Sequence, residues 1–375
     1  MPAPYSVQQY VHDLRAIRNT GSATDETSFY PPVDRLLNAA GDTLKPKVLF
    51  STQLRDDGAG RPDGGLFPQP RRSPRNAGPP PLQLPERGAV EIKPATYSLD
   101  ALAREEQTLR YLRRYGLVLI TNLREFRLLG LDASGNPQLL ERPYVLASSS
   151  EDLWHASIDP KHKELLPDFL RRVMLRKVPL TDPKDVAWFL ASYAREARAR
   201  AEDHDLPFFR NVKLALEESL GIQFEGEKGD HFFRSTLVQT LFYGIFSAWV
   251  LWRRSPNGRA LDPHFSWRLS DDFLHVPILN KLFREVSGRS NLNSIQITEI
   301  LDLAGDVLNR VEPSLFDTFR EEEAVAYFYE PFLEAFDPQL RKELGVWYTP
   351  KEIVHYMVER VDHLLRTELG QRPSA

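Results

Sequence analysis

Two short segments decide the fold of this chain: GRPDGG at residues 60–65 and VEIK at residues 90–93. The second predicts a β-strand in which Glu91 and Lys93, two positions apart, point to the same face of a sheet. Asp63, at the end of a preceding strand, brings a second carboxylate to the same edge. Two converging carboxylates suit a hard cation such as Mg2+, and the lysine can orient or deprotonate a water and offset the charge of a phosphate. The pattern predicts hydrolysis of a phosphodiester.

The residues around these segments predict an α/β domain over residues 1–148. Apolar residues at helical spacing predict helices over 6–20, 24–41 and 99–115, and strands are predicted over 47–53, 61–67, 88–93, 117–121 and 125–129. Residues 68–88 are rich in proline and arginine, so we interpret them as a loop inserted between two strands of one domain; a flexible linker is the alternative. The order of elements predicts a mixed sheet flanked by helices.

Beyond residue 149 the strand-like alternation disappears, and helical runs predict an all-α connector over residues 149–325. The runs cover 163–175, 182–202, 208–220, 232–252 and 297–309, and an amphipathic helix is predicted at 351–369. The many Arg and Glu side chains between 195 and 202 are interpreted as a solvated helix face, with a DNA-contacting face as the alternative. The apolar run at 237–252 is too short and too interrupted for a membrane span, so it predicts a buried helix.

The composition is that of a globular protein outside membranes. The 375 residues are 42% hydrophobic and 27% charged, and the N-terminus lacks a secretory pattern, so a cytoplasmic protein is expected. The absence of cysteine excludes disulfides and thiolate metal sites, and the scattered histidines lack ligand spacing. The net charge of −4 argues against a chain that coats nucleic acid, but not against a nuclease whose basic groups line one cleft.

Two separate pieces of the chain resemble known proteins. The first 145 residues resemble the PD-(D/E)xK nuclease fold of restriction enzymes, and the matching positions are Glu26, Pro62-Asp63, Glu91-Ile92-Lys93, Gln107 and Tyr111. The second piece, with YEPFL at 329–333 and GVWYTP at 345–350, is similar to the segment that leads into the adenine methyltransferase domain of single-chain restriction–modification enzymes. The order nuclease, helical connector, methyltransferase start is that of the type IIG/IIL enzymes and the related type ISP proteins.

The resemblance implies a restriction-endonuclease-like site that uses Mg2+, for which Mn2+ can substitute. The implied catalytic residues are Asp63, Glu91, Lys93 and Gln107, and the implied metal ligands are Asp63, Glu91 and Glu26. Glu26 has an alternative role as an acid at a helix start, and Gln107 as a surface glutamine. The DNA-binding candidates are Lys45, Lys47, Arg61, Arg71, Arg72 and Tyr111, for which solvated loop charge, or a core position for Tyr111, is the alternative.

The chain also departs from the family. Residues 326–375 match only the N-terminal helical segment of the methyltransferase domain, and neither its cofactor loop nor an Asn/Asp-Pro-Pro-Tyr motif occurs. No G-x-x-x-x-G-K-[ST] loop occurs either, so neither methylation nor ATP hydrolysis is expected of this chain. S-adenosylmethionine belongs to the absent core.

We therefore expect the endonuclease part of a restriction–modification enzyme that acts in phage defence. Its expected partners are double-stranded DNA, a methyltransferase and specificity portion in cis or as a separate subunit, and a second nuclease copy, since cutting both strands calls for a homodimer. One alternative is a non-catalytic subunit that binds DNA or docks to a separate methyltransferase. The other is an inactive remnant of a nuclease.

Overall fold

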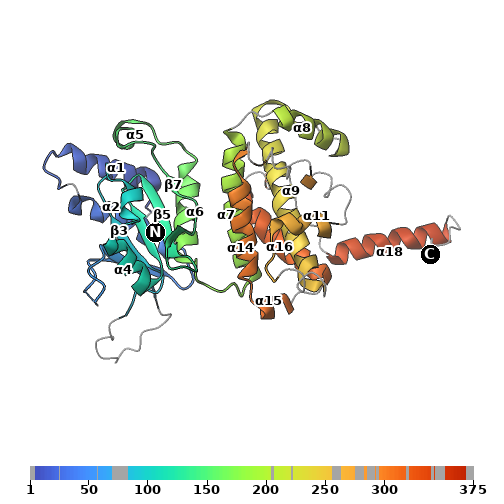
Figure 1. Ribbon diagram of the computed structural model, residues 1–375. Coiled ribbons are helices and arrows are strands. Elements are labelled where there is room, and N and C mark those ends of the chain that lie inside the picture. Colours follow the sequence, from blue (N-terminus) through green and yellow to red (C-terminus); the bar gives the residue numbers. More distant parts are fainter. Residues whose placement is uncertain are drawn as a thin grey trace, which may run out of the picture.

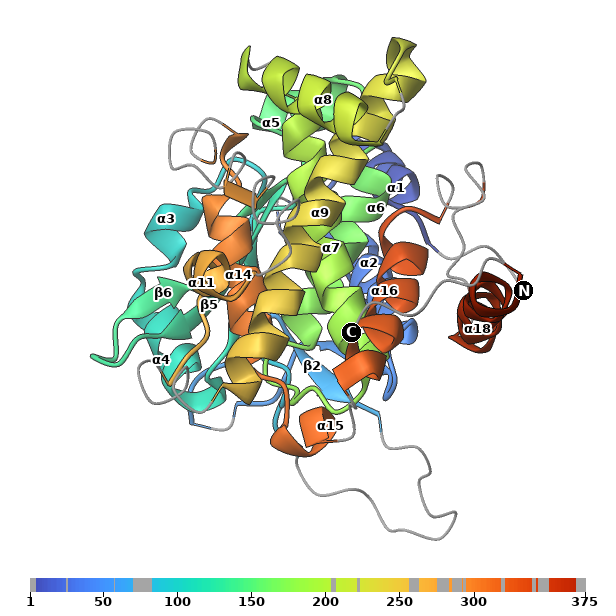
Figure 2. The same cartoon turned by 90° about the vertical axis from the view of Figure 1, so that its right-hand side faces the viewer.

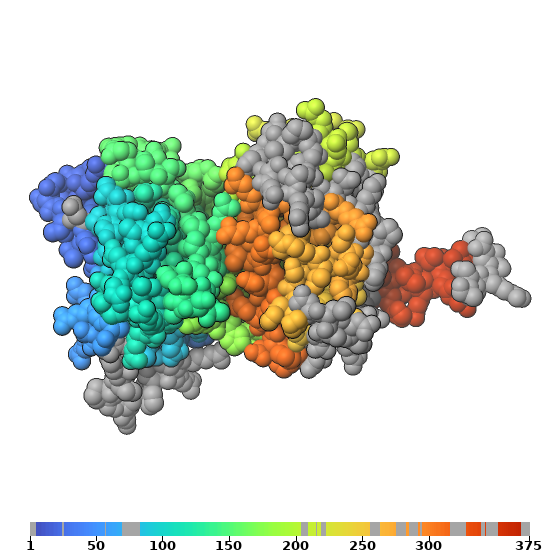
Figure 3. All heavy atoms as spheres, in the orientation of Figure 1, coloured from blue at the N-terminus to red at the C-terminus, as the bar shows by residue number. Residues whose placement is uncertain are grey.

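The computed structural model describes residues 5–24, 26–56, 58–69, 83–203, 207–220, 223–255, 263–274, 283–284, 292, 295–317, 321–338, 342 and 351–368. These residues form a lobe built around a β-sheet and a second lobe built from helices (Figure 1). Helix α18 (Lys351–Thr367) projects away from the helical lobe, as the space-filling view also shows (Figure 3).

The elements follow the predicted order. The sheet lobe contains α1 (Val7–Asn19), the 3-10 turn η1 (Thr27–Phe29), α2 (Tyr30–Asp42), β1 (Val48–Thr52), β2 (Gly64–Pro68), β3 (Ala89–Ile92), α3 (Leu99–Leu102), α4 (Glu106–Tyr115), β4 (Val118–Thr121), β5 (Glu125–Leu131), β6 (Pro137–Leu139), β7 (Tyr144–Val145), α5 (Ser150–His155) and α6 (His162–Met174). The helical lobe contains α7 (Pro183–Glu202), α8 (Pro207–Leu220), α9 (Gly226–Arg254), η2 (Trp267–Leu269), α11 (Ser270–Phe273), α14 (Thr298–Asn309), α15 (Pro313–Asp317) and α16 (Glu321–Phe336).

The predicted mixed sheet is present. Its strands lie in the order β1-β2-β3-β4-β5-β6, and β7 pairs with β5. The β3–β4 pair is parallel and the other pairs are antiparallel. Because β2 and β3 pair directly, the proline-rich segment between them is an insertion within one domain, as expected, although residues 70–82 of it lie outside the described part of the chain.

Strand alternation divides the side chains of the sheet between two cores. Val90 and Ile92 of β3 pack with α1, α2, α5 and α6 on one face, while Ala89 packs with α3 and α4 on the other. Glu91 alternates with Val90 and Ile92, so its side chain falls on the α3 and α4 face. This geometry places a carboxylate beside α4, the helix that carries two of the predicted site residues.

Three features of the sheet lobe differ from the expectation. The single helix predicted over residues 99–115 is broken into α3 and α4, because Glu105 is extended and its carboxylate accepts a hydrogen bond of 2.6 Å from the Tyr97 hydroxyl. The short β6, β7 and α5 were not predicted. The hydrophobic core of the sheet also continues past the expected boundary at residue 148, since Leu166, Phe169 and Val173 of α6 pack into it.

The helical lobe has its own core, in which α9 lies against α7 with α14 and α16 on either side (Figure 2). The expectation of a solvated face at residues 195–202 is wrong for the inner side chains. Arg195 is only 8% exposed and is paired with Asp168 of α6, and Arg198 is paired with Asp337. These charges join neighbouring helices rather than face solvent.

Helix α9 is long and apolar enough to cross a membrane by length and composition. However, 67% of its apolar window is buried against the rest of the protein. Phe242, Phe246 and Trp249 lie in the middle of the helical core. The predicted buried helix is therefore confirmed, with longer bounds than expected.

Candidate active site

The pairing of β2 with β3 brings Asp63 and Glu91 together. Gly64 pairs with Val90, so Asp63, one position before β2, falls opposite Glu91. The Asp63 carboxylate is fixed at both oxygens: Oδ2 accepts a hydrogen bond of 2.7 Å from the Ile92 N–H, and Oδ1 accepts one of 2.6 Å from the Tyr30 hydroxyl. Both carboxylates of the predicted pair thus lie at one end of neighbouring strands.

The two glycines after Asp63 allow this close approach. A Cβ on Gly64 would lie 2.2 Å from the Phe50 ring, and one on Gly65 would lie 2.7 Å from Pro85. Any larger residue would push β2 away from its surroundings and carry Asp63 with it. The GG of the decisive segment is therefore part of the site's construction.

Glu91 is the most buried member of the site, at 2% exposure. Its Oε1 accepts a hydrogen bond of 2.8 Å from Lys93 Nζ and a longer one of 3.4 Å from Gln107 Nε2. Its Oε2 is buried and has no hydrogen-bond partner among the described residues. Because buried polar atoms are nearly always satisfied, by protein groups, water or an ion, this oxygen is available as an acceptor or a metal ligand beside the Asp63 N–H, which also acts on the carboxyl.

Lys93 and Tyr30 connect Glu26 to the pair. Lys93 Nζ lies 3.5 Å from Glu26 Oε1, and the Tyr30 hydroxyl lies 3.3 Å from the same oxygen. The Glu26 side chain is 38% exposed, whereas that of Lys93 is 18% exposed. The structure therefore brings Glu26, Asp63, Glu91 and Lys93 into one network, with Glu26 on its solvent side.

Helix α4 adds the two remaining residues that the sequence predicted near the site. Gln107 and Tyr111 are one helical turn apart, and Gln107 Nε2 donates a hydrogen bond of 2.8 Å to the Tyr111 hydroxyl as well as its longer bond to Glu91. Tyr111 is 1% exposed and packs beside Gly60, where an added Cβ would lie 3.5 Å from the Tyr111 hydroxyl. Tyr111 thus supports Gln107 from the core and offers no surface to DNA.

The burial of these charges shifts their pKa values. Burial raises the pKa of Glu91 to about 7, and the charge of Asp63 adds to the rise against the opposing effect of Lys93. Burial also raises the pKa of Asp63 above its ordinary value, despite the hydrogen bonds from Tyr30 and Ile92. For Lys93, burial lowers the pKa, but the bond to Glu91 and the surrounding carboxylates outweigh it and leave the pKa above its ordinary value. Lys93 is therefore an ammonium at neutral pH.

The donor set fits a divalent cation held by two carboxylates. Mg2+ in proteins is usually bound by one or two carboxylates and keeps several waters. Asp63 and Glu91 provide such a pair, and the free Oε2 of Glu91 is the atom that such an ion would satisfy. Within the described residues no three His, Asp or Glu side chains are placed to hold a metal, so the assignment of Glu26 as a third ligand stays a prediction.

Of the predicted DNA-binding cations, Lys45 and Lys47 lie away from this site. Lys45 and Lys47 precede β1 at the end opposite Asp63, because Val48 pairs with Pro68 while Thr52 pairs with Gly64. Lys47 is also 2.6 Å from Asp42 in an exposed ion pair. Arg61 is exposed two positions before Asp63, and Arg71 and Arg72 lie outside the described residues.

Tyr30 is the site residue that the sequence reasoning missed. It is the first residue of α2, and the two prolines that follow it, Pro31 and Pro32, indicate a helix start but no site residue. The signal was present: Tyr30 is four positions after Glu26, a spacing that puts the two side chains on one side of a helical turn. Its hydroxyl contacts Asp63 and Glu26 together.

Comparison with known proteins gives little beyond this geometry. No family model and no curated protein matches the chain. Among solved structures, a chain of the cryo-EM structure of a DrdV–DNA complex aligns with 98% of this chain at 18% identity, with a TM-score of 0.29. The aligned part is 32% of that chain, so this protein spans about a third of its length. A likeness this weak establishes no shared activity.

Proposed function

We propose that this chain is the Mg2+-dependent DNA endonuclease part of a restriction–modification enzyme and hydrolyses phosphodiester bonds in double-stranded DNA. One observation carries the proposal: Asp63 and Glu91 meet across neighbouring strands beside Lys93, and one buried oxygen of Glu91 is left without a partner in the described structure.

Each residue of the site has a task in this reaction. Asp63 and Glu91 would hold the Mg2+ ion, which when bound supplies Lewis-acid polarisation of the phosphate and a more acidic water. The Tyr30 hydroxyl and the Ile92 N–H fix the orientation of Asp63. Gln107 fixes Glu91 from the helix side.

Lys93 acts through its charge. Without a bound metal, the hydrogen bond to Glu91 and the neighbouring carboxylates keep its pKa above the ordinary value. An ammonium beside the two carboxylates can offset the negative charge that develops on the phosphate in the transition state. Of the two roles that the sequence suggests for the lysine, we propose orientation and charge compensation rather than removal of a proton.

The exposed apolar side chains of helix α18 support docking to a methyltransferase, the role of the alternative candidate. In our proposal the same chain has this docking role in addition to its nuclease activity. The exposed large apolar side chains of α18 are Ile353, Val354, Tyr356, Met357, Val358, Val361, Leu364 and Leu365. A contiguous exposed apolar face marks an interaction surface. We assign it to the methyltransferase and specificity portion, in cis or as a separate subunit, which would also bind S-adenosylmethionine. A homodimer on DNA and a cytoplasmic location belong to the same proposal.

The proposal is tested by incubating the purified chain with supercoiled plasmid and Mg2+ or Mn2+. We expect nicking by the wild type and its loss in Asp63→Asn, Glu91→Gln and Lys93→Met, each of which keeps the size of the side chain. Lys163→Met is the matched control, since Lys163 is an exposed lysine on α6 outside the network. It should nick like the wild type.

Binding of Mn2+ measured by calorimetry separates catalysis from assembly. Asp63→Asn and Glu91→Gln should lose metal binding, whereas Lys93→Met should keep it, because Lys93 offers no ligand to a cation. If the wild type neither nicks DNA nor binds metal better than Asp63→Asn, the catalytic assignment fails and the docking role alone stands.

A further inference from the structure

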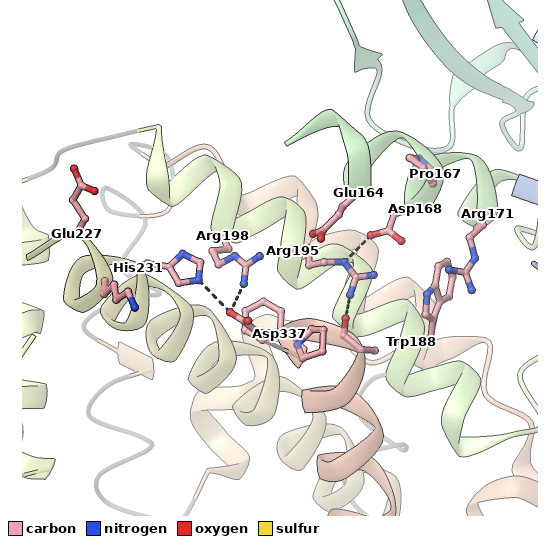
Figure 4. A pocket seen from close by; sticks show the side chains of 14 residues that line it. Glu164, Pro167, Asp168, Arg171, Trp188, Arg195, Arg198, Glu227, His231 and Asp337 are labelled. Atoms are coloured by element: carbon pink, nitrogen blue, oxygen red, sulfur yellow. Dashed lines mark hydrogen bonds and ion pairs between the residues drawn. The ribbon is translucent and has the colours of Figure 1, made fainter. Parts of the chain in front are cut away.

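A second site lies where α6 of the sheet lobe meets the helical lobe. A cavity of about 760 Å³ opens between α6, α7, α9 and the end of α16. Figure 4 shows its lining, with Arg171 and Trp188 at one end, Asp168 and Arg195 between, and His231 with Asp337 toward the other. Its volume lies within the roughly 300–1,000 Å³ of small-molecule sites.

Of the four acids that line the cavity, Asp168 and Asp337 are neutralised by their own partners, and Glu164 and Glu227 also lie in the lining. Asp168 accepts a hydrogen bond of 2.7 Å from Arg195 Nε, and Asp337 accepts one of 2.6 Å from Arg198 Nη1. His231 Nε2 also lies 3.3 Å from Asp337. These pairs hold α6, α7, α9 and the end of α16 in fixed positions around the cavity, so the site is built before any ligand arrives.

Arg171 and Lys228 are cations of the lining that take no part in these pairs, and Arg171 is the one held against an aromatic ring. Its guanidinium lies over the Trp188 ring, 4.2 Å from the centroid, and its Nε is buried without a hydrogen-bond partner among the described residues. Asp168 is close enough to favour the charged form of Arg171, but its carboxylate is engaged by Arg195. Burial lowers the pKa of Arg171 below its ordinary value, in keeping with a guanidinium short of acceptors.

An unpaired guanidinium at the wall of a cavity has a specific chemical complement. Its planar fork of N–H groups matches the oxygens of a phosphate, and stacking on an aromatic ring holds the fork in one orientation. The paired Asp168 and Asp337 repel an anion less than free carboxylates would, and the Trp188 ring offers apolar surface to the rest of the ligand.

We infer that this cavity binds a phosphate group through Arg171, carried either by the backbone of DNA or by a free phosphorylated molecule. The inference goes beyond the nuclease proposal, because no residue of the sheet site takes part. The cavity would give the junction of the two lobes a phosphate-binding function of its own.

The test measures binding of pyrophosphate and of a short DNA duplex by calorimetry, in a buffer that contains a chelator so that no metal occupies the sheet site. We expect the wild type to bind pyrophosphate and Arg171→Met to bind it about 10- to 100-fold more weakly, since charge-assisted hydrogen bonds are lost while the stem over Trp188 is kept. Lys163→Met, which alters an exposed cation on the same helix, should bind like the wild type.

Competition between the two probes identifies the source of the phosphate. Displacement of pyrophosphate by the duplex in the wild type assigns the site to the DNA backbone, and failure to displace it assigns the site to a free phosphorylated molecule. The thermal midpoint without ligand shows that Arg171→Met is folded, and it should be unchanged or higher because an unpaired buried charge is removed. Absence of pyrophosphate binding, or equal binding by Arg171→Met, overturns the inference.

Discussion

Replacement of Arg172 by methionine should destabilise the protein strongly. The Arg172 side chain is 3% exposed, and it donates hydrogen bonds of 3.2 Å to Glu141 and 2.8 Å to Glu196 while lying 4.4 Å from the centroid of the Tyr193 ring. Its removal leaves the Glu141 carboxylate, 1% exposed, with the Tyr193 hydroxyl and the more distant Arg176. Breaking a buried pair in this way costs about 3–5 kcal/mol.

The neighbouring Arg171 supplies the control within the same helix. Arg171→Met makes the same change in composition but breaks no ion pair, so the urea midpoint should stay close to that of the wild type. In the double variant Glu141→Gln/Arg172→Met the loss should be smaller than the sum of the two single losses, because no buried charge is stranded. The reasoning is refuted if Arg172→Met costs less than about 1 kcal/mol, or if the two losses simply add.

Three further predictions concern other contacts. Hydrogen bonds to Asp337 and Glu202 raise the pKa of His231 to about 9, so the protonated imidazole stabilises the folded state. This stabilisation is complete below about pH 6.5, is lost as the pH rises through 9, and amounts to about 1 kcal/mol after solvent screening. Urea titrations at pH 7 and 10 should show the loss in the wild type but not in His231→Asn. Tyr30→Phe removes the hydrogen bond to Asp63 and should cost about 1–2 kcal/mol by the same assay, whereas an unchanged midpoint would show that the bond contributes nothing. In Gly41→Ala the added Cβ would lie 1.9 Å from a backbone oxygen, so α2 must move from β1 at a cost of about 3 kcal/mol; a melting temperature equal to that of the wild type would contradict this contact.

Much of the sheet lobe follows from local patterns. Alternation in a strand fixes the direction of Glu91 relative to Lys93, and the four-residue spacing of Gln107 and Tyr111 puts them on one side of a helix. These geometric rules act over a few residues and need no knowledge of the rest of the fold. The catalytic roles of these residues stay predictions, because the positions of the side chains do not show that the protein hydrolyses DNA.

Long-range contacts were beyond such rules. Arg195 and Arg198 have the composition of a solvated helix face, and their acidic partners lie 27 and 139 positions away in the sequence. Polarity alone does not distinguish a charge in water from one paired with a distant carboxylate. The same limit hid Tyr30, whose contact with Asp63 spans 33 positions.

The burial of α9 has a consequence for how the protein is made. The Phe246 ring of α9 stacks on the Phe328 ring of α16, with 3.7 Å between the ring centroids. Helix α16, however, follows α9 in the chain by about 70 residues. At about 5–20 residues per second, a ribosome takes several seconds to supply that partner. During this interval the side of α9 that α16 covers in the folded protein lacks that partner, in a helix with the length and hydropathy of a membrane span. Nascent chains paused in this window should therefore be strong clients for chaperones that shield hydrophobic segments.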